Sequence, residues 1–148
     1  MLKLLSDLLT ADRLDIAEDG VASLSGYMGT WVTLDSNNAL TITTAAVRPA
    51  YPIWNESATL AETAPGFTDD VGETGKLTVL TGKHRALTNQ YSGTPAVNGL
   101  LATYAGGLLI TNTTPGDGLV VAVCTKAPHS VDYRGESFLC IEYETIGA

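Results

Sequence analysis

The sequence is poor in the side chains that carry most enzyme chemistry. Only two histidines and two cysteines occur in 148 residues, and charged residues make up 16%, against about 25% in an average soluble domain. His84 lies between Lys83 and Arg85, a setting that predicts a solvent-facing ring, and His129 follows Pro128 in an expected loop. A nucleophilic cysteine needs a neighbouring base and a third, orienting group. The sequence offers no such set, so we expect no enzymatic activity.

Cysteine, glycine and acidic residues also carry no clear cofactor signal. Cys124 and Cys140 lie in apolar, strand-like runs and are expected to be reduced, buried thiols, with a disulfide between neighbouring strands as the alternative. The glycines follow neither the dinucleotide-binding nor the phosphate-loop pattern. Asp69, Asp70 and Glu73 lack the alternating spacing of an EF-hand, so a solvated loop is favoured over a weak cation site. We therefore expect no cofactor and no metal.

Positive charge is scarce as well. Lys and Arg number 8 against 16 Asp and Glu, which gives a formal net charge of −8. Nucleic-acid binding needs a clustered positive footprint, so no nucleic-acid partner is expected. The sequence has no apolar run long enough to span a membrane and no clean signal peptide. It predicts a protein made and used in a cytoplasm, with no membrane partner.

Residues 1–20 are expected to form a short amphipathic helix or arm. Leu4, Leu5, Leu8 and Leu9 recur at helical spacing, which favours a helix with one apolar face. So short a helix is marginal by itself, so it must dock on its own domain or on a neighbouring chain. These four leucines are candidate interface residues.

Residues 21–148 are expected to form a single β-rich domain. The hydrophobic period becomes two, and a hairpin is predicted with its turn at Asp35–Asn38. Further strand-like runs are separated by turn signals at Asn98-Gly99 and Gly106-Gly107, and LVVAVCTK is apolar on both faces, as in a central strand. Many short strands with glycine-rich turns predict a mostly β fold, a compact antiparallel β-sandwich or barrel.

A long loop and a final strand complete this expected domain. Residues 55–75 are rich in Asp, Glu, Thr, Ala and Gly without periodicity, and are expected to form a surface loop. The final strand, SFLCIEYETI, is expected to place Leu139, Ile141 and Tyr143 on one face. Cys140 and two glutamates fall on the other face.

Three aromatic residues are candidate contacts with another molecule. Trp31 lies in the first hairpin strand, and Tyr51 and Trp54 lie beside Pro49 and Pro52, which exclude a central strand. Aromatic residues outside the core often anchor interfaces or stack on sugars. Core packing is the alternative for Trp31. For Tyr51 and Trp54, contact with another chain and packing within the domain both stay open.

The segment from Ala86 to Ile146 has a recognisable order of strand-like runs and turns. It contains the run ALTNQYSGTPAVNGLLATYAGGLLITNTTPGDGLVVAVCTKAP and closes with SFLCIEYET. It contains a strand ending near an aromatic residue, a Tyr-x-x-x-x-Ala-Val-x-Gly turn, a glycine-rich hairpin and a valine-rich strand. This layout resembles the decoration, or cement, proteins of tailed-bacteriophage capsids. The resemblance implies a small β-rich protein that binds the exterior of an assembled shell as a homo-oligomer, a dimer or a trimer. It would brace neighbouring major capsid subunits against the pressure of packaged DNA.

The functional hypothesis is therefore a structural virion protein on the capsid exterior, made in the cytoplasm of a bacterial host. Its expected partners are the phage major capsid protein and further copies of itself. The alternative comes from a different class: a carbohydrate-binding or adhesin-like β module. In that alternative Trp31, Tyr51 and Trp54 stack on sugar rings.

Overall fold

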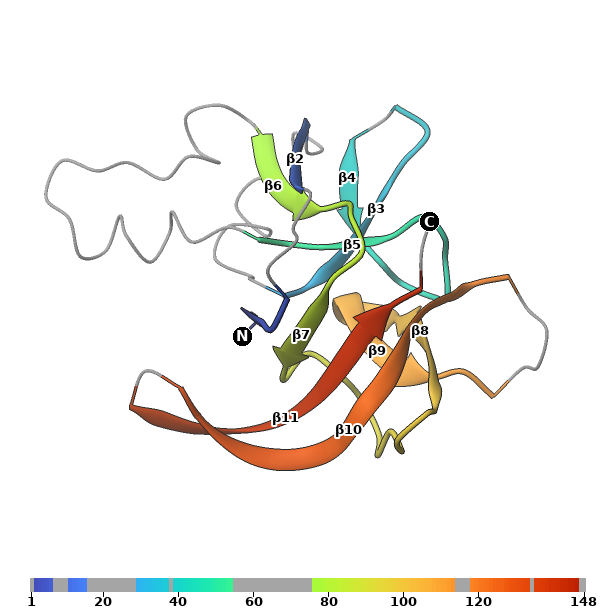
Figure 1. Ribbon diagram of the computed structural model, residues 1–148. Helices are drawn as coiled ribbons and strands as arrows, with labels where there is room; N and C mark the ends of the chain where they lie inside the picture. The colour runs from blue at the N-terminus through green and yellow to red at the C-terminus, as the bar shows by residue number, and fades with distance from the viewer. Residues whose placement is uncertain are drawn as a thin grey trace, which may run out of the picture.

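Antiparallel strands make up nearly all the regular structure in the described part of the chain (Figure 1). The computed structural model describes residues 2–6, 11–15, 29–37, 39–54, 76–113, 118–133 and 135–146. Within these ranges the one helical element is a 3-10 turn, Ala105–Gly107. The mostly β, antiparallel fold expected from the sequence is therefore confirmed.

The larger layer is a six-stranded sheet in the order β1-β7-β11-β10-β8-β9, and every pairing in it is antiparallel. The run expected to be a central strand is the first part of β10, which lies between β11 and β8. The strands, in sheet order, are Leu2–Leu4, Arg85–Thr88, Glu136–Thr145, Val120–Tyr133, Leu100–Tyr104 and Leu108–Thr111.

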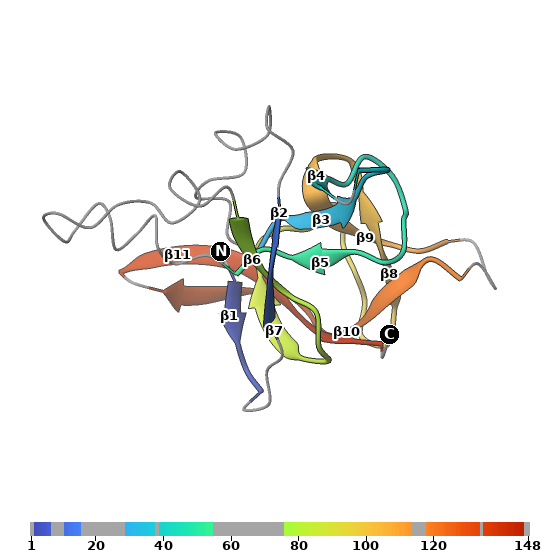
Figure 2. The same ribbon diagram turned by 90° about the horizontal axis from the view of Figure 1, so that it is seen from above.

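The second layer combines two small sheets (Figure 2). One has the order β4-β3-β5 and the other pairs β2 with β6, and a bridge between Ile53 and Val79 links them. The short strand β5, which contains Pro52, pairs with β3 over two residues only, in line with the exclusion of a central strand. The strands are Leu40–Ile42, Trp31–Leu34, Tyr51–Pro52, Ala11–Asp15 and Lys76–Leu80.

The predicted first hairpin is formed by β3 and β4, and Asp35 closes its turn. The carboxylate Oδ1 of Asp35 accepts hydrogen bonds from the backbone N–H groups of Asn37 at 2.8 Å and Ala39 at 3.0 Å. Asp is favoured at such a position because its carboxylate accepts hydrogen bonds from backbone N–H groups of the turn. Local turn chemistry thus fixes the register of the hairpin.

The core lies between the two layers. Trp31 of β3 packs against Tyr143 of β11, with ring centroids 5.9 Å apart at a tilted angle of 56°. Val32, the next residue along β3, is also fully buried and packs on the other face with Leu40, Ile53 and Val79. The second layer is therefore apolar on both faces. The main cluster consists of Leu2, Trp31, Leu80, Ala86, Leu101, Leu109, Val121, Ala122, Cys124, Ile141 and Tyr143.

Strands occupy the two described stretches where the N-terminal helix was expected. Leu2–Leu4 (β1) adds to the edge of the six-stranded sheet, and Ala11–Asp15 (β2) pairs with β6. The helix prediction is wrong for both, because a sheet edge supplies backbone partners while a helix of so few turns is marginal. Leu2 is 1% exposed, so this part of the segment docks on its own domain. Leu8 and Leu9 lie outside the described residues, as does the expected loop 55–75.

The strands β10 and β11 continue beyond the sandwich as a curved two-stranded ribbon (Figure 1). β8 pairs with β10 over Val120–Val123, and β7 pairs with β11 over Ile141–Glu144. Among the described residues no further strand pairs with residues 127–133 and 136–140. His129 is in this ribbon, opposite Cys140, so the loop expected at His129 is a strand.

The ladder between β10 and β11 is irregular along β10. Register shifts fall between Cys124 and Lys126 and between Lys126 and His129. Cys140 and Ile141 are both fully buried, whereas Leu139 is 58% exposed. Of the three side chains expected on one face, Ile141 and Tyr143 are buried in the sandwich, whereas Leu139 lies on the part of β11 that projects beyond it.

Candidate functional site

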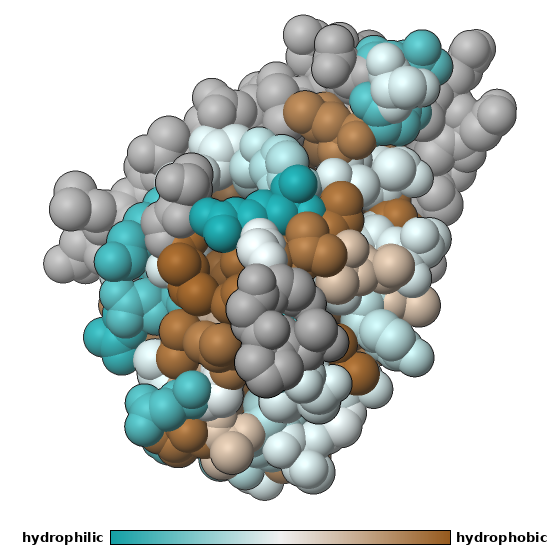
Figure 3. Space-filling view, turned by 90° about the vertical axis from the view of Figure 1, so that its right-hand side faces the viewer, coloured by the Kyte–Doolittle hydropathy of each residue, from teal (hydrophilic) through white to brown (hydrophobic). Residues whose placement is uncertain are grey.

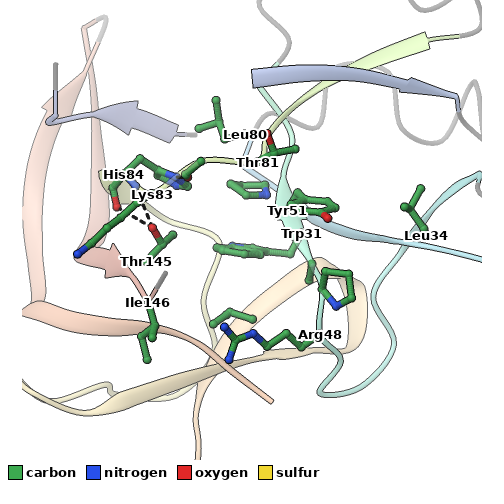
Figure 4. Close-up of a pocket in the computed structure, with 15 residues that line it drawn as sticks. Trp31, Leu34, Arg48, Tyr51, Leu80, Thr81, Lys83, His84, Thr145 and Ile146 are labelled. Atoms are coloured by element: carbon green, nitrogen blue, oxygen red, sulfur yellow. Dashed lines mark hydrogen bonds between the residues drawn. The ribbon is translucent and has the colours of Figure 1, made fainter. Parts of the chain in front are cut away.

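A pocket of about 280 Å³ opens where the second layer meets one end of the six-stranded sheet (Figure 4). Three parts of the chain form it. They are β3 with the segment 48–52 that includes β5, the turn between β6 and β7, and the start of β10 together with the end of β11. The lining residues are Trp31, Leu34, Arg48, Pro49, Ala50, Tyr51, Pro52, Leu80, Thr81, Gly82, Lys83, His84, Val121, Thr145 and Ile146.

Burial separates the floor of the pocket from its mouth. Trp31, Leu80 and Val121 are buried and form an apolar floor, whereas Arg48 and Lys83 are exposed at the mouth. The chain carries a net charge of −8. The two permanently charged residues that line the pocket are nevertheless both basic, so the local charge of the pocket is opposite in sign to that of the whole chain.

Lys83 at the mouth lies beside an acidic side chain. The Lys83 Nζ lies 3.7 Å from Glu144 Oε1, and both side chains are substantially exposed. Solvent-exposed pairs of this kind contribute at most about 1 kcal/mol. An anion entering the pocket therefore competes with a weak interaction at Lys83.

His84 lies on the buried side of the pocket, and the solvent-facing ring expected from its charged neighbours is wrong. Its side chain is 2% exposed, and its backbone N–H donates to Thr145 Oγ1 at 2.9 Å (Figure 4). Its Nδ1 lies 2.9 Å from the Gly82 carbonyl oxygen, which can only accept, so Nδ1 carries the proton. Its Nε2 then accepts from the Tyr143 hydroxyl at 2.9 Å.

Burial has opposite effects on the two groups of this pair. It lowers the pKa of His84, with a smaller opposing effect from the hydrogen bond to Gly82, and it raises the pKa of Tyr143. Both groups are therefore neutral near pH 7. The neutral imidazole is hydrogen-bonded to the Gly82 carbonyl and the Tyr143 hydroxyl, so it holds the turn between β6 and β7 against β11.

Trp31 has the core role that was the alternative to an interface. The side chain is 1% exposed, and its indole Nε1 has no hydrogen-bond partner among the described residues. An indole this buried offers no ring face to a sugar. Stacking on carbohydrate through Trp31 is therefore not supported.

The other candidate interface residues are spread over the molecule. Tyr51 is half-buried and lines the pocket beside Trp31, whereas Trp54 is half-buried against the main core cluster. Leu4 is half-buried in β1, and Leu5 is 38% exposed just after it. Among the candidates that the structure describes, Trp31 and Tyr51 line the same pocket.

Large exposed apolar side chains form a set that the sequence reasoning, apart from Leu5, missed. Among the described residues they are Leu5, Val97, Leu100, Tyr104, Leu119, Leu139 and Ile146. Figure 3 shows apolar surface among polar residues on one face of the molecule. A signal was available at Val97 and Leu100, because they flank the Asn98-Gly99 turn, where a side chain has no core to enter.

Within the described ranges, no group of three or more His, Cys, Asp or Glu side chains is placed to hold a metal ion. The acidic residues 69–73 lie outside those ranges. Cys124 and Cys140 are buried and are not joined in a disulfide, as expected, and burial raises the pKa of each thiol. No helix in the described part of the chain has the length and hydropathy to cross a membrane.

The fold and the pocket define a small antiparallel β-sandwich protein with a projecting two-stranded ribbon. No protein-family model and no curated protein matches the chain.

Proposed function

We propose that this protein is a non-enzymatic structural virion protein that binds the outer surface of an assembled phage capsid. It stabilises contacts between major capsid subunits. The observation that carries the proposal is the β10–β11 ribbon, residues 127–133 and 136–140, which projects from the sandwich. This ribbon includes the strand that closes the segment resembling capsid decoration proteins.

The ribbon has the properties of a contact element. Paired rows place Val131 opposite Phe138 on one face and Ser130 opposite Leu139 on the other, and Leu139 is 58% exposed. A two-stranded ribbon is at best marginally stable by itself in water. Apolar side chains on such a ribbon gain most by burial against a neighbouring molecule.

The proposed mechanism is thermodynamic linkage. A protein that binds only the assembled lattice stabilises that lattice by a free energy that grows with the logarithm of its concentration relative to Kd. Many copies on a symmetric shell, each a homo-oligomer with several contacts, add avidity to weak individual sites. The exterior location and the self-association belong to the same proposal.

The test uses capsids stripped of the protein. Stripped, expanded capsids should lose thermal resistance and recover it when the purified protein is added back, and electron microscopy should place the added density outside. Leu139→Asp should weaken attachment about tenfold without unfolding the protein, because Leu139 is 58% exposed. Val97→Asp is the matched control, because Val97 is an apolar residue of similar exposure, 53%, outside the ribbon. Wild-type protein that does not bind expanded capsids contradicts the proposal.

The carbohydrate-binding alternative has less support. Of its three proposed stacking residues, Trp31 is buried and Trp54 is half-buried against the core. A glycan array separates the two functions, because specific binding to a saccharide is expected only for the alternative.

A further inference from the structure

We infer that the pocket between the two layers binds a small ligand made of one flat apolar group and one anionic group, such as an aromatic carboxylate. This inference goes beyond the proposed capsid role and does not depend on it. It rests on the composition of the floor, the sign of the charges at the mouth and the size of the cavity.

The floor suits an apolar ring. Trp31, Leu80 and Val121 close the bottom of the pocket with buried apolar side chains. The half-buried side chains of Leu34, Ala50 and Tyr51 offer apolar surface at its sides. Displacing water from such surfaces gains about 25 cal/mol for each Å² that a ligand covers. A cavity of about 280 Å³ lies at the small end of known ligand pockets, so it matches a single ring better than a larger ligand.

The mouth suits an anion. Arg48 and Lys83 are exposed lining residues on different segments, and no Asp or Glu lines the described pocket. A guanidinium group forms charge-assisted hydrogen bonds with carboxylates. Because both cations are solvated, each adds modest affinity that salt weakens.

The Trp31 indole offers a spectroscopic reporter at the floor of the pocket. The Trp31 Nε1–H is buried and has no acceptor among the described residues, which is uncommon for a buried polar group. Because this indole lines the floor of the pocket, its N–H resonance serves as a reporter of ligand binding.

The experiment is an NMR titration with phenylacetate, and with phenylacetamide as its neutral counterpart. Phenylacetate should bind with a Kd on the order of 1 mM and shift the Trp31 indole resonance and the amides of Thr81 and Lys83. The indole of Trp54, which does not line the pocket, is the internal control and should not move. Phenylacetamide should bind more weakly than phenylacetate, by a factor of about three or more.

Variants test charge and shape separately. Lys83→Gln and Arg48→Gln should each weaken phenylacetate binding about threefold and leave phenylacetamide binding unchanged. Arg85→Gln is the matched control, because Arg85 is exposed but does not line the pocket. Ala50→Phe fills the pocket and should abolish binding of both probes, with the amide spectrum showing whether the variant is folded.

Two results would overturn the inference. One is a Trp31 indole resonance that does not move with phenylacetate up to its solubility limit. The other is equal affinity for the two probes together with no effect of Lys83→Gln and Arg48→Gln. Neither result bears on capsid attachment, which is measured separately.

Discussion

The Tyr143 hydroxyl lies 2.9 Å from His84 Nε2 and donates to it, although the two residues are 59 positions apart. Their rings meet edge to face, with centroids 5.5 Å apart. The contact joins the turn between β6 and β7 to strand β11 beneath the pocket. It makes the fold sensitive to the protonation of one histidine.

Stability should fall as the pH drops below about 6.5, the ordinary pKa of histidine. Burial lowers the pKa of folded His84, so the unfolded chain binds a proton at a higher pH than the folded chain does. The stabilisation is therefore complete above about pH 6.5, and it is lost as the pH falls toward the lowered folded pKa. Urea unfolding at pH 7.5 and at lower pH should show that the free energy of unfolding falls by up to about 1.4 kcal/mol for each pH unit.

His84→Gln is the reference for this measurement, because it removes the titrating ring and leaves the other acidic and basic groups in place. The wild type should lose more stability than the variant between the two pH values. An equal loss in both proteins would show that His84 does not contribute to the pH dependence.

Two adjacent glycines should respond differently to the same substitution. Gly106 and Gly107 have φ values of +75° and +73°, but a Cβ on Gly106 meets nothing within 4 Å, whereas one on Gly107 would collide with Thr30 Cγ2 and lie 2.9 Å from the Trp31 carbonyl oxygen. Gly106→Ala should cost about 1 kcal/mol of stability for its backbone conformation alone. Gly107→Ala should cost about 2 kcal/mol or more beyond that. Thermal unfolding of both variants tests this, and equal melting temperatures would contradict it.

The N-terminal strand should contribute to the stability of the domain. Leu2 is 1% exposed in the main core cluster, whereas Leu5 is 38% exposed. Leu2→Ala should therefore cost about 2–4 kcal/mol, and Leu5→Ala less than about 1 kcal/mol, measured by urea unfolding. If the segment were an independent arm, neither substitution would change domain stability.

The two thiols should be nearly unreactive in the native protein. Cys124 and Cys140 are fully buried, and burial raises the pKa of each, which reduces the reactive thiolate fraction. Labelling with an aromatic disulfide reagent at pH 8 should be at least about a hundredfold slower than in urea-unfolded protein. Rapid labelling of either cysteine without denaturant would contradict the buried position.

Local patterns were enough to predict most strands and turns. The Asn98-Gly99 signal predicts a tight turn, and Asn98 indeed has a φ of +67°, because that conformation is set by the residues of the turn itself. Buried, reduced cysteines were predicted correctly for a similar reason: each lies within an apolar strand. The candidate site was predicted less completely. The sequence singled out Trp31 and Tyr51 but did not predict the pocket that they line with Arg48 and Lys83.

The sequence by itself determined a mostly β, antiparallel chain with its turns in place, because strand alternation and turn chemistry depend on neighbours along the chain. Only the tertiary structure decided that Leu2 pairs across from Thr88 and that His84 turns inward to Tyr143. Both outcomes depend on partners far away in sequence, whose burial and hydrogen bonds outweigh local helical spacing and charged neighbours. The pocket has the same origin, since three distant segments meet to form it.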